Sequence, residues 1–359
     1  MSRNDRPKQL VPFIQQKGRR MSLLEIAAER LEGLVPPERR YICTSESYRT
    51  AVRTSLPRFR DEQILGEPVG RDTVNAVGFA AAVLHKVDPE AAFCVLTADH
   101  LIEPEDLFRD RIELGFEMVE ADPTRLVTFS IKPAYPATAY GYVERGAAIP
   151  GTDGLAYRVE RFVEKPTREK AQAYIESGAF GWNSGMFVWK AATILDCLRR
   201  YKPESHAGLT KIAAAWGTDR QKRALEEVYP TLPRISVDYA IMEPATREQT
   251  RTGASASGPA SGVKVCTILM DLTWLDVGSW PSYGDTLSAD EMGNRVSGNA
   301  RMFRTKDSMV VNSDDRHTVA LLGCEGLVVV HTEDATLVMP AERAEELKLL
   351  HAELPERLK

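Results

Sequence analysis

The first part of the chain alternates short apolar runs with amphipathic segments. Apolar runs predict strands at residues 40–44, 63–67, 92–97 and 126–131. Helical periodicity predicts helices at residues 22–31, 48–56, 73–86 and 105–120. The first helix is marked by Ser22 followed by Glu25, the pattern of a capping box. Strands alternating with helices predict an α/β fold with a mostly parallel sheet covered by helices on both faces.

The run at residues 92–97 is continuously apolar, which is typical of a parallel strand buried on both faces. After about residue 290 the pattern changes to short alternating apolar runs separated by Gly, Asn and Asp. These runs lie at residues 309–311, 318–322, 327–330 and 336–339. They predict a small β-rich domain, closed by a charged helix at residues 341–350. We therefore predict two domains, residues 1–288 and residues 289–359.

Residues 252–262 form a low-complexity stretch of Thr, Gly, Ala, Ser and Pro. This composition favours a flexible surface insertion over a linker between domains. It lies just before the segment that contains Asp276, and the sequence gives it no functional role.

Composition and charge narrow the classes of function. The chain is 43% hydrophobic and 27% charged, as in soluble globular proteins. A net charge of -5 argues against a general nucleic-acid binder. No apolar run is long enough to span a membrane and no signal peptide opens the chain, so we expect a cytoplasmic protein without a membrane partner. The six histidines form no ligand-spaced cluster, which argues against a zinc site.

The cysteines are scattered, odd in number and mostly inside apolar runs. They are Cys43, Cys94, Cys197, Cys266 and Cys324. This distribution predicts buried free thiols in a reducing compartment, with neither a disulfide nor a metal role.

Polar residues follow the predicted strands at the edge where open α/β sheets bind ligands. Asp99 and His100 come directly after the strand at 92–97, and Arg71 and Asp72 follow the strand that ends near Glu67. We expect His100 to have a structural hydrogen-bonding role and not to act as a base.

Two aspartates are candidate metal ligands. Asp99 follows a buried strand, and Asp276 lies in an aromatic, glycine-containing segment, residues 274–280. Two carboxylates from distant segments suit Mg²⁺, which completes its coordination with water and phosphate oxygens. Each aspartate alone is more often a cap or turn residue than a metal ligand.

Two further segments indicate a site for a small anionic ligand. In residues 162–166, Phe-Val-Glu-Lys-Pro, Lys165 is flanked by apolar residues and is suited to hold a phosphate. In residues 182–187, Trp-Asn-Ser-Gly-Met-Phe, a compact turn offers an amide, a hydroxyl and a glycine backbone to sugar hydroxyls. Either segment alone is common as a strand end or a turn.

Taken together, the segments resemble bacterial mannose-1-phosphate guanylyltransferases, from residue 2 to about residue 350. The resemblance rests on residues 5–9, 67–73, 98–100, 141–144, 162–166, 182–187, 236–243 and 276–280. Each segment is weak evidence alone, whereas all of them in this order are specific. The resemblance implies a Rossmann-like α/β fold of the nucleotide-diphospho-sugar transferase type, followed by a β-helix-like domain.

The resemblance also implies a reaction. GMP would pass from GTP to mannose 1-phosphate, with Mg²⁺, giving GDP-mannose and pyrophosphate. Mannose 1-phosphate supplies its own anionic nucleophile, so catalysis would rest on positioning and charge neutralisation. The scarcity of histidine near the motifs agrees with this chemistry. A homodimer through the C-terminal domain is a further expectation.

Site residues follow from the resemblance position by position. The implied catalytic residues are Lys8, Asp99, Lys165 and Asp276, of which Asp99 and Asp276 would hold the metal. The implied nucleotide-binding residues are Arg6, Lys8, Glu67, Arg71, Asp72, Thr73 and Asp99. The implied sugar-phosphate-binding residues are Gly141, Tyr142, Glu164, Lys165, Asn183 and Asp238.

The chain departs from the family pattern at its start. Family members open with a strand and a Gly-Gly-x-Gly-Thr-Arg-Leu-Trp-Pro-x-Ser-Arg segment, and this chain begins at the last three of those positions, Met1-Ser2-Arg3. Either Met1 is an internal methionine taken as the start, or the strand and the phosphate-binding loop are missing. Asn75 stands where many members have proline, which leaves base selectivity open.

Two other functions stay open. The same chemistry could act on another sugar 1-phosphate or nucleotide, which a substrate panel would separate. A shortened chain could instead be a non-catalytic sugar-nucleotide-binding protein. The presence of Asp99, Lys165 and Asp276 argues against the second alternative. The isomerase activity of longer, bifunctional relatives is not expected.

Overall fold

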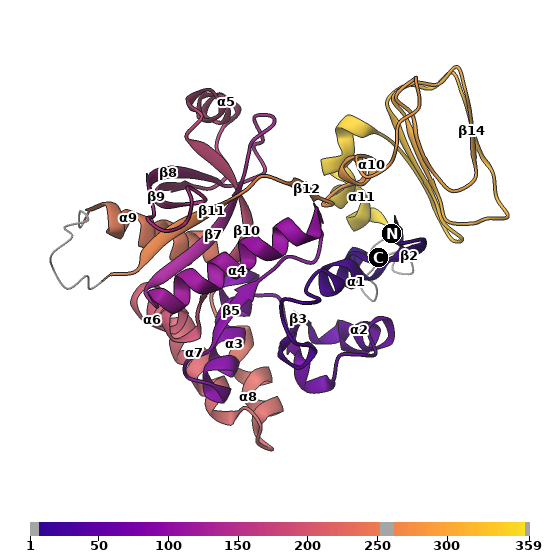
Figure 1. Cartoon of the computed structure of the whole chain (residues 1–359). Coiled ribbons are helices and arrows are strands. Elements are labelled where there is room, and N and C mark those ends of the chain that lie inside the picture. Colours follow the sequence, from indigo (N-terminus) through magenta and orange to yellow (C-terminus); the bar gives the residue numbers. More distant parts are fainter. Residues whose placement is uncertain (1–6, 252–261, 356–359) are drawn as a thin grey trace. The chain divides into compact units, whose positions relative to one another are not determined.

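A computed structural model describes residues 7–251 and 262–355 (Figure 1). The chain divides into two compact units. The terminal unit contains Met1–Glu29, Ala98–Ile102 and Thr273–Lys359, and the sheet unit contains Arg30–Thr97 and Glu103–Leu272. The predicted insertion at 252–262 lies almost wholly outside the described residues. Among the described residues, no helix is both long and apolar enough to cross a membrane.

The sheet unit is built on a six-stranded sheet in the order β5-β10-β7-β11-β9-β8. The strands are β5 (Ala92–Val95), β7 (Arg125–Ile131), β8 (Tyr142–Ala148), β9 (Ala156–Val163), β10 (Phe180–Lys190) and β11 (Lys264–Met270). β7 and β11 pair in parallel, β10 is antiparallel to β5, β7 and β8, and β9 is antiparallel to β8 and β11. Thus β5, β7, β8 and β11 run one way, and β9 and β10 run the other way.

Helices cover both faces of this sheet, which confirms the predicted α/β class. The helices of the unit are α2 (Arg49–Ser55), α3 (Asp72–Val87), α4 (Glu105–Ala121), α5 (Arg168–Ser177), α6 (Ala191–Tyr201), α7 (Pro203–Ala215), α8 (Gln221–Val228) and α9 (Glu243–Arg251). Successive residues of a strand point to opposite faces. Val188 of β10 accordingly faces Gly115 of α4, whereas Phe187 and Trp189 join the core beneath α3 and α6.

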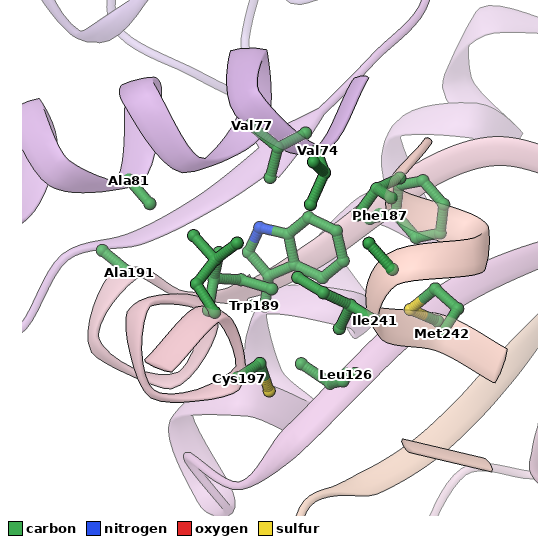
Figure 2. Packing of buried hydrophobic residues seen from close by; sticks show 14 of the residues in the cluster. Val74, Val77, Ala81, Leu126, Phe187, Trp189, Ala191, Cys197, Ile241 and Met242 are labelled. Atoms are coloured by element: carbon green, nitrogen blue, oxygen red, sulfur yellow. The ribbon is translucent and has the colours of Figure 1, made fainter. Parts of the chain in front are cut away.

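Trp189 is the centre of that core. Its indole is fully buried and stacks on Phe187 with ring centroids 4.8 Å apart. Figure 2 shows it surrounded by side chains from α3, α6, β7 and the π-helical turn η6 (Asp238–Met242). These neighbours are Val74, Val77, Ala81, Leu126, Ala191, Cys197, Ile241 and Met242. One aromatic side chain therefore fixes the start of α3 and η6 to the same sheet.

The prediction for residues 92–97 was wrong in two respects. β5 pairs antiparallel with β10, and all four of its residues are partly exposed. Within the described part of the chain β5 pairs only with β10 and lies at the end of the sheet order. The strands β3 (Ile42–Ser45) and β4 (Ile64–Glu67) form a separate parallel pair.

The terminal unit contains the predicted β-rich region. β13 (Arg295–Ser297), β15 (Met309–Asn312) and β17 (Leu327–His331) pair in parallel, and β18 (Thr336–Pro340) joins β17 antiparallel. A second parallel pair consists of β14 (Ala300–Phe303) and β16 (Val319–Leu322). The two sheets enclose an apolar core made of Ala300, Val310, Val319 and Val329. The predicted last helix is a 3-10 turn, Ala341–Glu346, followed by α11 (Leu347–Glu353).

The N-terminal part of this unit packs in a second apolar core of the β-rich region, which includes Met309, Val311, Val328 and Val330. It comprises β1 (Ile14–Gln16), β2 (Arg19–Met21) and α1 (Leu23–Glu29). The capping box is confirmed, because the Ser22 amide donates to Glu25 Oε2 at 2.7 Å and the Glu25 amide donates to Ser22 Oγ at 3.2 Å.

The five cysteines are free, as predicted, but their burial was overestimated. Cys197 and Cys266 are buried, Cys94 and Cys324 are partly exposed, and Cys43 is exposed. Burial raises the pKa of the Cys197 and Cys266 thiols to about 12, so both are inert thiols at neutral pH.

Replacing Trp189 with alanine should lower the free energy of unfolding by about 3–5 kcal/mol, because the remaining side chains cannot refill the volume of a buried indole. Urea denaturation followed by circular dichroism measures the effect, with W189F as the milder comparison. An unchanged unfolding midpoint for W189A would contradict the central place of this residue.

Candidate functional site

Two aspartates are brought together in the terminal unit. Asp99 precedes β6 (His100–Glu103), and Asp276 ends β12 (Thr273–Asp276). The two strands pair with each other, and the Val277 amide donates to the Asp99 carbonyl at 2.9 Å. Ligand atoms of Asp99, His100 and Asp276 all lie within 4.8 Å of one another. Burial, and then the charge of Asp99, raise the pKa of Asp276 despite the opposing effect of Lys8. Such a pair of carboxylates favours a bound cation.

His100 does not contribute a ligand to this cluster. Trp274 Nε1 donates to His100 Nδ1 at 3.1 Å, and the two rings pack edge to face. A ring that accepts at Nδ1 is neutral and carries its proton on Nε2, so neither nitrogen keeps a lone pair for a metal. His100 is buried and has the hydrogen-bonding role expected from the sequence.

The two carboxylates fit a hard divalent cation. They offer oxygen ligands, which Mg²⁺ prefers, and they are accessible because Gly278 lies beside Asp276. A Cβ at Gly278 would lie 3.1 Å from Asp276 Oδ1 and crowd any ligand there. Lys8 lies beside the other carboxylate, Asp99. Its Nζ is 3.1 Å from Asp99 Oδ2 and 2.9 Å from the Val277 carbonyl oxygen. Arg6, which is also predicted to bind the nucleotide, lies outside the described residues.

The sheet unit gathers four of the predicted sugar-binding residues. Asn183 Nδ2 donates to Asp238 Oδ1 at 3.0 Å, and the backbone N–H of Asn183 donates to the Gly141 carbonyl at 2.8 Å. A Cβ at Gly141 would lie 2.5 Å from Glu164 Oε2, so a side chain there would displace the Glu164 carboxylate. The grouping therefore offers two carboxylates and one amide, the groups that proteins use to bind sugar hydroxyls.

The two carboxylates of this grouping are hard to ionise together. Burial, followed by the negative charge of Glu164, raises the pKa of Asp238 to about 7. Burial also raises the pKa of Glu164, although the adjacent Lys165 lowers it. Asp238 opens the π-helical turn η6, a local geometry that is frequent at functional sites.

Lys165 presents its ammonium group to solvent. Its side chain is 61% exposed, and Nζ lies 3.5 Å from Glu164 Oε1. The backbone adopts φ +44°, a left-handed conformation that side-chain-bearing residues rarely take. A strained and accessible lysine next to a buried carboxylate is consistent with a phosphate-binding role.

Tyr142 follows Gly141 in the chain, but its side chain lies in the core. It is fully buried, donates its hydroxyl to the Ala137 carbonyl at 3.0 Å and accepts from Trp182 Nε1 at 3.0 Å. Its hydroxyl thus holds the loop before β8. Residues 182–187, predicted to be a turn, lie within β10, where a bulge and φ +69° at Gly185 interrupt the ladder.

Four of the predicted nucleotide-binding residues, Glu67, Arg71, Asp72 and Thr73, lie at or just before the start of α3. Asp72 and Thr73 are exposed there, and Asp72 has φ +63°. Tyr229 donates to Glu67 Oε1 at 2.5 Å, the Val237 amide donates to Thr73 Oγ1 at 2.9 Å, and Arg71 donates to the Pro230 carbonyl. One segment, residues 229–237, therefore supports this group, and it leads directly into Asp238.

Asn75 strengthens the same support. It is fully buried, and its Nδ2 donates to the carbonyls of Arg71 at 3.0 Å and Pro233 at 2.6 Å. A proline at this position would make neither bond. The asparagine that departs from the family pattern thus links the start of α3 to Pro233 in this chain.

Comparison with known proteins decides the family. Residues 3–292 match the nucleotidyl transferase family, and residues 304–354 match the MannoseP isomerase/GMP-like beta-helix domain. This chain belongs to the nucleotidyl transferase family. It is accordingly a transferase enzyme, and the resemblance identified from its sequence is confirmed.

Individual relatives of this nucleotidyl transferase agree. A mannose-1-phosphate guanylyltransferase of Klebsiella pneumoniae is 37% identical over 97% of this chain and 69% of the relative. A putative mannose-1-phosphate guanylyltransferase of Vibrio cholerae is 31% identical over 97% of this chain and 70% of the relative. A solved structure from Thermus thermophilus, described as a mannose-1-phosphate geranyltransferase, is 33% identical with a TM-score of 0.81, covering 98% of this chain and 93% of that one.

Asp238 makes the stability of the protein depend on pH. Its pKa of about 7 in the folded state lies above the value of about 3.9 in an unfolded chain, so the folded state binds the proton more tightly. Its contribution to stability is present at low pH and is lost as the pH rises through about 7. D238N has no carboxyl at this position and does not lose this stability as the pH rises. The melting temperature of D238N minus that of wild type should therefore be larger at about pH 8 than at about pH 5. The same offset at both pH values would contradict the raised pKa.

Proposed function

We propose that this chain transfers GMP from GTP to mannose 1-phosphate, giving GDP-mannose and pyrophosphate. The observation that carries the proposal is the similarity to mannose-1-phosphate guanylyltransferases over nearly the whole chain. The grouping of sugar-binding candidates around Asn183 and the paired carboxylates Asp99 and Asp276 supports it.

The reaction needs no nucleophile from the protein. An oxygen of the sugar phosphate attacks the α-phosphorus of GTP, a P–O bond forms there, and the bond to the β-phosphate breaks with its electron pair leaving on pyrophosphate. The protein lowers the barrier by holding the groups in line and by neutralising charge. A neutral His100, held by Trp274, takes no part in proton transfer.

Asp99 and Asp276 would hold Mg²⁺. When bound, the ion supplies positive charge to the phosphate oxygens. Lys8, kept in place by Asp99 and the Val277 carbonyl, presents an ammonium to the nucleotide phosphates. We assign four residues to the nucleotide: Glu67, Arg71, Asp72 and Thr73. Hydrogen bonds of Arg71 and Thr73 with residues 229–237 keep this group ordered.

The sugar phosphate is assigned to the group around Asn183. Lys165 neutralises its phosphate, while Glu164 and Asp238 accept from its hydroxyls and the second hydrogen of Asn183 Nδ2 is donated to it. Gly141 leaves the space beside Glu164 that a side chain would fill. Tyr142 supports this group from the core and does not contact the sugar.

We further propose a cytoplasmic homodimer. Phe303 and Leu322 are partners in register on β14 and β16, and both side chains are exposed. A second copy would cover this apolar pair. Light scattering after size-exclusion chromatography should give twice the chain mass of 39.9 kDa. A mass that stays at one chain would contradict the dimer.

A substrate panel tests the proposed function. Pyrophosphate release is measured for several nucleoside triphosphates, each with several sugar 1-phosphates, in the presence of Mg²⁺. The proposal expects the highest kcat/KM for GTP with mannose 1-phosphate. A higher value for another pair would reassign the substrates, and GDP-mannose binding with no release from any pair would favour a non-catalytic binder.

Lys165→Ala should raise the KM for mannose 1-phosphate by about 10- to 100-fold, the loss expected when a charge-assisted bond to phosphate is removed. The KM for GTP should change little. Lys170→Ala, which removes an exposed lysine of α5, is the matched control and should leave both constants unchanged. Equal KM values for K165A and K170A would remove Lys165 from the phosphate site.

A further inference from the structure

The ladder between β10 and β7 is interrupted beside the sugar-binding candidates. Asn183 pairs with Ser130 and Phe187 pairs with Thr128, so three residues of β10 face one residue of β7 between them. Bulges of this kind re-aim side chains and are frequent next to active sites. The side chain of Thr128 lies at the interruption.

The Thr128 hydroxyl contacts the amide of Asn183 directly. Its Oγ1 lies 2.8 Å from Asn183 Oδ1 and 3.1 Å from the Met186 carbonyl oxygen, and Thr128 is fully buried. The Gly185 amide donates to the same Oδ1 at 3.4 Å. The oxygen of the Asn183 side chain therefore faces two donors, the Thr128 hydroxyl of β7 and the Gly185 amide of the bulge.

This arrangement selects one orientation of the amide. With Oδ1 toward Thr128 and Gly185, Nδ2 donates to Asp238 Oδ1 at 3.0 Å. A flipped amide would place its N–H groups against the Gly185 N–H and, when Asp238 is ionised, its oxygen against the Asp238 carboxylate, and both contacts are repulsive. We propose that Thr128 is a positioning residue, which fixes the Asn183 amide so that Nδ2 keeps one hydrogen for a hydroxyl of the sugar 1-phosphate.

A purely structural role for Thr128 is less consistent with its surroundings. Threonine is favoured in strands, but valine has the same shape and would serve the strand equally. Thr267 of β11 lies directly opposite Thr128 and is equally buried, yet among the described residues its hydroxyl has no hydrogen-bond partner. This layer of the sheet therefore does not itself require a hydroxyl.

The test compares T128V with T267V, the same change at neighbouring buried positions, and with T128S, which keeps the hydroxyl. T128V should raise the KM for mannose 1-phosphate about tenfold, the effect of losing one oriented hydrogen bond, and leave the KM for GTP within about twofold. T128S and T267V should behave as wild type. A purely structural role would change both KM values together and lower the melting temperature, which would overturn the proposal.

This inference rests on the proposed function, so a second readout works without turnover. In protein labelled with ¹⁵N-asparagine, the side-chain amide signal of Asn183, assigned with N183D, should shift or broaden in T128V and stay unchanged in T267V. An unchanged signal and unchanged KM in T128V would overturn the positioning role while leaving the proposed function intact. Failure of wild type to use mannose 1-phosphate, with the signal still shifted in T128V, would overturn the function alone.

Discussion

Two close pairs of carboxylates are the constraint on which the chemistry of this molecule depends. Asp99 and Asp276 lie close together in the terminal unit, and Glu164 and Asp238 lie close together in the sheet unit. In three of these four groups, Asp276, Glu164 and Asp238, burial raises the pKa, and in the two aspartates the charge of the other carboxylate raises it further. Such pairs reduce the stability of the empty protein, and the cost is offset when a cation, a proton or a ligand hydroxyl arrives. The pairing of β6 with β12 and the bond from the Val277 amide to the Asp99 carbonyl hold the segments of the first pair together.

The supports behind these pairs are rigid and specific. Around Trp189, the start of α3 and the turn η6 pack on one sheet, so residues near Thr73 and Asp238 are supported by the same core. Residues 229–237 add a second connection, because they bond to Glu67, Arg71, Thr73 and Asn75 before reaching Asp238. An error in placing this segment would disturb both groups of ligand-binding candidates at once.

Much of the fold could be predicted from the sequence, since hydrophobic period and local chemistry determine elements. The capping box at Ser22 and the strands of the C-terminal region were found in this way. Pairing could not be, because periodicity does not identify a strand's neighbours. β10 lies between β5 and β7, which makes β5 antiparallel to its neighbour and leaves it partly exposed.

The candidate site shows the same division. The family resemblance identified Asn183, Glu164 and Asp238, and the structure brings them together. Residues 182–187 were taken for a turn because Asn-Ser-Gly is turn chemistry, whereas a bulge within a strand uses the same residues. Thr128 carries no sequence signal, since its hydroxyl matters only because that bulge places it against Asn183.

The site proposed at Asp99 and Asp276 for one divalent cation is central to the chemistry. Electron paramagnetic resonance of Mn²⁺, titrated into the protein in competition with Mg²⁺, tests it directly. We expect one competing site per chain in wild type and loss of that site in the D99N/D276N variant. Unchanged Mn²⁺ binding by the double variant would contradict it.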